Sequence, residues 1–221
     1  MKDYTILRSK RKTVALIVTS EGALIIKAPL KASNVEIEEI IKRKKTWIEQ
    51  KQVIAKNKKE LYRVHKFEAG EEFLFLGRKF PLIFTEKIKG VKLEKDNLYI
   101  NKHIQDKNNA ITKWYKKAAK IILSEQVCKY EKITGLKTSS IKISSAKRRW
   151  GSCGREGNIN FSFRLIMCPI EVIDYVVLHE IVHIVYHDHS KDFYNCLKLF
   201  MPDYKKHKNW LCDNQRIMDI I

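Results

Sequence analysis

The sequence lacks any long uncharged apolar segment. None approaches the roughly 20 residues that a helix needs to cross a bilayer. The first residues, MKDYTILRSKRK, lack the apolar stretch of a signal peptide. The chain also contains no internal repeat and no low-complexity tract. These absences predict a cytoplasmic protein that has no membrane partner.

Paired cysteines are absent as well. The five cysteines are widely spaced, and no two of them form a C-x-x-C pair. This pattern argues against a disulfide framework and against a cysteine zinc knuckle. Cys153 differs from the others because it lies in the glycine-flanked segment RRWGSCG. It is a candidate nucleophile or metal ligand, and the simpler interpretation is a cysteine packed near the active site.

Acidic residues are scarce relative to basic ones. The chain has 44 Lys and Arg against 25 Asp and Glu, a formal net charge of +19. Such a charge favours anionic partners, nucleic acid or nucleotides above all, although scattered solvated lysines explain it equally well. Residues 137–164 contain seven basic residues and one acid, whereas residues 169–192 contain five acids and one lysine. A basic segment therefore directly precedes an acidic one.

The hydrophobic pattern predicts an α+β protein. Alternating apolar residues indicate strands in residues 4–28 and 71–101, and a capping box at Ser33 predicts a helix to about residue 57. We place Trp47 on the buried face of that helix. A helix over about 106–133 is followed by two strands that flank the glycine-rich loop RRWGSCGREG. With 44% hydrophobic residues, the chain can bury a substantial core.

The segment YVVLHEIVHIVYHDHS, residues 175–190, carries the clearest chemistry. On a helix, residues four apart differ by about 40° in azimuth, so His179 and His183 project side by side and can bind one metal ion. Glu180 follows the first histidine and can act as general base on a metal-bound water, as in H-E-x-x-H enzymes. The helix is apolar nearly all round, and a metal would satisfy polar groups that are otherwise costly to bury. This pattern predicts a metal-dependent hydrolase.

Zinc enzymes usually supply three protein ligands and leave one position for water. We favour His189 as the third ligand, because Ser190 is a plausible N-cap at which the chain can turn back. The alternatives are His187 and, more weakly, Asp192 or Asp203. The six-residue step from His183 to His189 also occurs in metzincins, but Tyr186 stands where they have glycine.

The chain resembles the YgjP-like metallopeptidase-domain proteins. The resemblance is carried by RRWGSCGREGNINFSFRLIMCP, YVVLHEIVHIVYHDHSKDFY and MPDYKKHKNWL. It implies a zincin-like fold with one zinc ion per chain, held by His179, His183 and His189, and Glu180 as catalytic acid and base. We accordingly expect an N-terminal β-rich region with one helix at 1–104 and a zincin-like metallohydrolase domain at 105–221.

Three functions remain open. The first is hydrolysis of peptides, in which an edge strand holds an extended substrate by strand addition. The candidate donors to the oxyanion or substrate are Arg149, Arg164, Tyr204 and His207.

The second function is hydrolysis of a nucleoside triphosphate, since the resembling family has been linked to pyrophosphate release from uridine triphosphate. Lys147, Arg148, Arg149 and Arg164 would then clamp the phosphates. The chain has no Walker-type glycine loop, and three histidines suit zinc better than magnesium.

The third function is a nucleic-acid-binding protein with a structural metal. It is disfavoured because structural zinc normally has four protein ligands.

Overall fold

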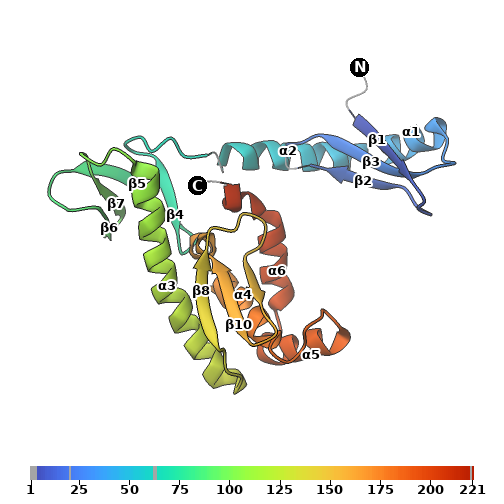
Figure 1. Ribbon diagram of the computed structural model, residues 1–221. Coiled ribbons are helices and arrows are strands. Elements are labelled where there is room, and N and C mark those ends of the chain that lie inside the picture. Colours follow the sequence, from blue (N-terminus) through green and yellow to red (C-terminus); the bar gives the residue numbers. More distant parts are fainter. Residues whose placement is uncertain (1–3, 20, 62–63, 220) are drawn as a thin grey trace. The chain divides into compact units, whose positions relative to one another are not determined.

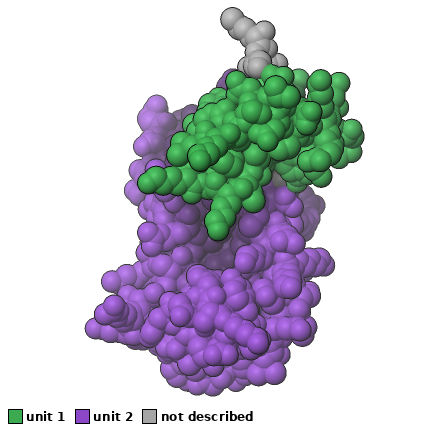
Figure 2. Space-filling view, turned by 90° about the vertical axis from the view of Figure 1, so that its right-hand side faces the viewer, with its two compact units in different colours: residues 1–63 green, residues 64–221 purple. Residues whose placement is uncertain are grey.

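The computed structural model describes residues 4–19, 21–61, 64–219 and 221. The chain forms two compact units, residues 1–63 and 64–221, coloured separately in Figure 2. The boundary lies before the strands of residues 72–101, whereas the sequence analysis placed it after them, at 104/105. These strands belong with the second unit because they contact its helices and the turn that precedes the metal-motif helix.

The N-terminal unit is a three-stranded sheet packed against two helices (Figure 1). Its strands β1, β2 and β3 are Tyr4–Ser9, Ala15–Val18 and Leu24–Pro29. They lie in the order β1-β3-β2, with β1 parallel and β2 antiparallel to β3. The core consists of aliphatic side chains: Leu24, Ile26, Ala28, Ile37 and Ile48.

The predicted helix after Ser33 is divided at Lys44 into α1, Asn34–Arg43, and α2, Lys45–Leu61. The capping box at its start is confirmed by hydrogen bonds in both directions between Ser33 and Glu36. The prediction that Trp47 is a core residue is wrong, because its exposed fraction is 39%. Residues one apart on a helix differ by about 100°, so Trp47 lies off the buried face that Ile48 occupies.

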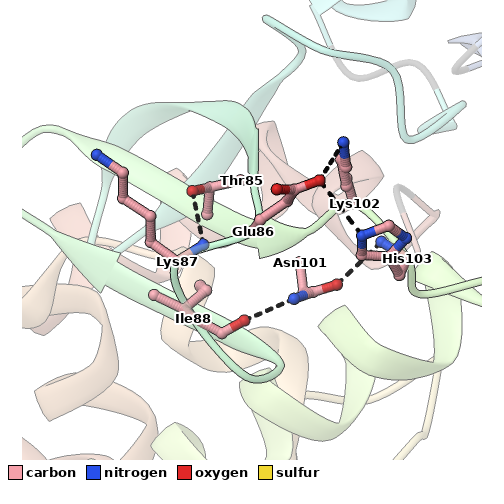
Figure 3. Close-up of polar contacts among 7 residues, drawn as sticks. All are labelled: Thr85, Glu86, Lys87, Ile88, Asn101, Lys102 and His103. Atoms are coloured by element: carbon pink, nitrogen blue, oxygen red, sulfur yellow. Dashed lines mark hydrogen bonds and ion pairs between the residues drawn. The ribbon is translucent and has the colours of Figure 1, made fainter.

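The second unit begins with a four-stranded sheet in the order β4-β5-β7-β6. The four strands are β4, Glu72–Phe75; β5, Arg78–Thr85; β6, Val91–Glu94; and β7, Asn97–Asn101. Figure 3 shows how the connection after β5 is tied to the end of β7. The Asn101 amide donates to the Ile88 carbonyl over 2.7 Å, and the Glu86 carboxylate pairs with Lys102 and His103.

The helix α3, Lys107–Thr134, runs alongside the rest of the unit (Figure 1). The helix is capped by Gly135, which adopts a left-handed conformation with φ 74°. A second sheet has the order β8-β10-β9, with β8 at Ser140–Ser144, β9 at Gly151–Cys153 and β10 at Asn158–Ser162. The strand predicted after the loop ends at Ser162 and continues as a 3₁₀ helix, η1, Phe163–Met167.

Three helices complete the unit: α4, Ile170–Val182; α5, Lys191–Phe200; and α6, Tyr204–Asp213. They are followed by a short 3₁₀ helix, η2, Gln215–Asp219.

The start of α4 is held by the β4–β5 turn. Leu76 N–H donates to the Ile166 carbonyl over 2.7 Å, and a Cβ on Gly77 would lie 2.9 Å from Pro169 Cγ. The long helix α3 braces α4 through the Lys129–Asp174 ion pair at 2.7 Å. These contacts give the metal-motif helix a fixed position.

Candidate metal centre

The end of α4 and the start of α5 bring three histidines together. One ring nitrogen from each of His179, His183 and His189 lies within 4.8 Å of the others. The Nε2 atoms of His179 and His189 are 3.1 Å apart. Two imidazole ligands of one tetrahedral zinc ion are separated by about 3.3 Å. The sequence-predicted trio is therefore assembled, and His187 is exposed outside it.

Local hydrogen bonds place the second and third histidines. His183 follows the last residue of α4, and its Nδ1 lies 2.8 Å from the Tyr186 carbonyl oxygen. Because a carbonyl only accepts, Nδ1 carries the proton and Nε2 keeps a lone pair. His189 directly precedes Ser190, whose hydroxyl accepts from Phe193 N–H as the predicted N-cap of α5.

The ring of Phe193 backs all three imidazoles. It is fully buried, and its centroid lies 4.9, 4.5 and 5.0 Å from those of His179, His183 and His189. Phe193 was not among the site residues predicted from the sequence. The sequence feature that could have identified it is its position: an apolar residue in the first turn after the Ser190 cap is expected to face the preceding helix.

The polar atoms of the trio are arranged as a cation would require. Burial, then the neighbouring histidines, lower the pKa of His179 to about 3. Burial also lowers the pKa of His183. Both rings are thus neutral at pH 7, the form that binds metal. His179 Nδ1 is buried without a hydrogen-bond partner among the described residues, so the ring gains its polar interactions at Nε2. A set of three imidazoles fits a first-row divalent metal.

The carboxylate of Glu180, the residue after His179, is buried. It is 6% exposed, and burial raises its pKa to about 7, a shift that the charge of Arg149 opposes. Its side chain lies directly against strand β9: a Cβ on Gly151 would lie 2.6 Å from Glu180 Oε1. Only glycine leaves room for the carboxylate in this position. Gly151 belongs to the segment RRWGSCG, but its contact with Glu180 was not predicted from the sequence.

The other candidate residues lie in two groups. Arg149 is exposed in the loop before β9, and its charge reaches Glu180. Arg164, in contrast, is buried and donates to the backbone carbonyls of Ser145 and Ile221. Its donors are therefore used within the fold.

Tyr204 and His207 are both buried on α6. Tyr204 stacks on Tyr194 with ring centroids 5.8 Å apart, and His207 Nε2 lies 3.2 Å from the carboxylate of Asp203, the residue that precedes α6. The structure thus gives both residues packing contacts around the site.

Cys153 lies on β9, close enough to Glu180 for the two groups to interact electrostatically. Burial, and then the charge of Glu180, raise the pKa of its thiol to about 11. A cysteine acts as nucleophile or metal ligand in its thiolate form. The raised pKa therefore favours the packed role.

A family model describes this combination of fold and site. The YgjP-like metallopeptidase domain matches residues 12–214. The chain belongs to this family. Membership and the histidine trio together indicate a metal-dependent hydrolase.

A comparison with solved structures finds the crystal structure of the metallopeptidase zymogen of Pyrococcus abyssi abylysin. It has 18% sequence identity and a TM-score of 0.39, and covers 42% of this chain and 96% of that chain. No curated protein matches the chain.

Among the described residues, no helix has the length and apolar character to span a membrane.

Proposed function

We propose that the protein is a zinc-dependent metallopeptidase in which Glu180 is the general base. The supporting observation is a buried carboxylate, with its pKa raised to about 7, on the residue that follows the first of three convergent imidazoles. A general base works best when its pKa lies near the operating pH. The three histidines would hold one zinc ion per chain, because three imidazoles leave a fourth position open.

When bound, zinc would lower the pKa of a water molecule and polarise the scissile carbonyl. Glu180 would accept a proton from the attacking water and return it to the leaving nitrogen. Gly151 lets this carboxylate approach β9, and burial keeps competing water away from it. Because β9 is the outer strand of its sheet, its free edge is available to pair with an extended peptide.

Substitution of Glu180 by Gln tests the proposal, because it keeps the shape of the side chain and removes the base. We expect turnover of a peptide library to fall by about 10³-fold, while about one zinc per chain is retained. Glu171→Gln, in the exposed first turn of the same helix, is the matched control and should keep full turnover. Undiminished peptide cleavage by the Glu180 variant would rule out the mechanism.

Hydrolysis of a nucleoside triphosphate is the second candidate. The observation that favours it is the exposed loop before β9, in which Lys147 and Arg148 precede Arg149 beside Glu180. Arg164 would not contribute to a phosphate clamp, since its guanidinium binds backbone carbonyls. Pyrophosphate release from uridine triphosphate by the wild type, and not by Glu180→Gln, would favour this reaction over peptide hydrolysis.

A further inference from the structure

Lys208 lies beside the histidine trio without belonging to it. Tyr194 follows Phe193 on α5, and its ring centroid is 6.1 Å from that of His189. The ammonium group of Lys208, on α6, donates to the Tyr194 hydroxyl over 3.3 Å and lies 5.1 Å from the centre of its ring. The tyrosine therefore holds a cation near the trio through both a hydrogen bond and a cation–π contact.

The charge of Lys208 has no carboxylate partner among the residues that the structure describes. This charge is held next to the trio through Tyr194, whose ring centroid lies 6.1 Å from that of His189. The outside charge that acts on Glu180, from Arg149, is also positive. Lys208 and Arg149 thus both bring positive charge to the region of the trio.

A bound divalent metal would add further positive charge to this region. Like charges repel, and the repulsion is stronger where water is partly excluded. An anion placed near the metal would relieve it, and the substrate is the molecule that enters the site. Tyr194 limits the freedom of a lysine side chain that is otherwise mobile, so less entropy is lost when the lysine binds an anion.

We propose that Lys208, oriented by Tyr194, binds a carboxylate of the substrate next to the histidine trio. This proposal rests on the proposed peptidase function and adds a substrate class to it. The carboxylate belongs either to an acidic side chain near the scissile bond or to the free C-terminus of the peptide. In the first case the protein selects acidic sequences, and in the second it removes residues from peptide ends.

Three matched peptides distinguish the two sources. All three share one sequence, and the first version carries Glu and an amidated C-terminus. The second carries Gln and an amidated C-terminus, and the third carries Gln and a free carboxylate. We expect Lys208→Met to lower kcat/KM about tenfold for one carboxylate-bearing peptide and to leave the neutral peptide unchanged. Tyr194→Phe should lower kcat/KM for the same carboxylate-bearing peptide by a smaller factor. Lys205→Met, an exposed lysine on the same helix, is the matched control and should change nothing.

A binding measurement separates this inference from the peptidase mechanism. Fluorescence anisotropy of the same labelled peptides is measured with metal-free Glu180→Gln protein, which needs no turnover. Weaker binding of a carboxylate-bearing peptide after Lys208→Met supports the inference even if the wild type cleaves no peptide. Cleavage with equal rates for all three peptides, or a preference that survives Lys208→Met, overturns the inference and leaves the peptidase function in place.

Discussion

The two units of the protein use buried side chains for different purposes. The core of the N-terminal unit is made of five aliphatic residues. Among the described residues, the buried polar or charged side chains all belong to the second unit: Ser162, Arg164, Glu180 and His207. Burying apolar surface stabilises a fold, whereas burying an ionisable group costs free energy unless the group is paired. The buried ionisable groups, and with them the candidate reactive site, therefore belong to the second unit.

Within the second unit, Arg164 and Glu180 illustrate two outcomes of burial. The Arg164 guanidinium donates to the carbonyls of Ser145 and Ile221, so its polar groups are satisfied by the fold. Within the described part of the chain, no comparable set of partners stabilises the charge of Glu180, and burial raises its pKa to about 7. A buried arginine satisfied by backbone is a structural element, whereas a carboxylate with a strongly shifted pKa beside a ligand cluster marks a reactive site.

The largest expected effect concerns the ligands of the second unit. His189→Ala should lower zinc affinity by about 10³-fold or more, because it removes one of three ligands. His187→Ala is the matched control and should change the affinity by less than about threefold, since this neighbouring histidine lies outside the trio. Competition with a chromophoric chelator measures both. Equal losses in the two variants would show that the trio is wrongly assigned.

The N-terminal unit should respond through stability alone. Ile26→Ala removes a fully buried side chain from its central strand and should cost about 3 kcal/mol. Hydrogen exchange would detect the loss in β1 to β3. Zinc stoichiometry and turnover should stay at wild-type values. If metal binding fell together with the exchange protection, the separation of stability and chemistry between the units would be incorrect.

The stability of the metal-free protein should depend on pH through Glu180. Its folded-state pKa of about 7 lies above the ordinary glutamate pKa of 4.5, so the folded state binds the proton more tightly than the unfolded state does. Stability from this group is therefore full below about pH 4.5 and is lost as the pH rises to about 7. Over that range the wild type should lose about 3 kcal/mol relative to Glu180→Gln. Urea unfolding of both proteins at several pH values tests this prediction. If the free energies of unfolding of the two proteins had the same pH dependence, the raised pKa of Glu180 would be contradicted.

Gly151→Ala probes the contact between β9 and the catalytic helix. The added Cβ would meet Glu180 Oε1 at 2.6 Å, so the carboxylate must move. We expect turnover to fall by about 10²-fold, roughly 2.7 kcal/mol, because the base is displaced from its working position. Gly90→Ala is a useful control, since Gly90 has φ 94° and no neighbour within 4 Å of the added Cβ. It should cost stability through backbone strain and leave turnover unchanged.

Local sequence signals predicted the elements that carry the site. The capping residues Ser33 and Ser190, and the helix stop at Gly135, act through their own backbone neighbourhoods, so they were readable directly. The four-residue spacing of His179 and His183 likewise needs only a helix. The prediction for Trp47 failed because the apolar pattern alone did not identify the face of the helix that the sheet covers.

The sequence by itself determined the α+β class, the family and the chemical character of the metal motif, because these depend on local periodicity and on residue types at short spacing. Tertiary structure alone decided how distant segments meet. It assigned Arg164 to the fold, placed Gly151 against Glu180, and brought Lys208 to Tyr194 beside the trio. The physical reason is that contacts between segments far apart in the chain depend on packing, and no local pattern in the sequence records them.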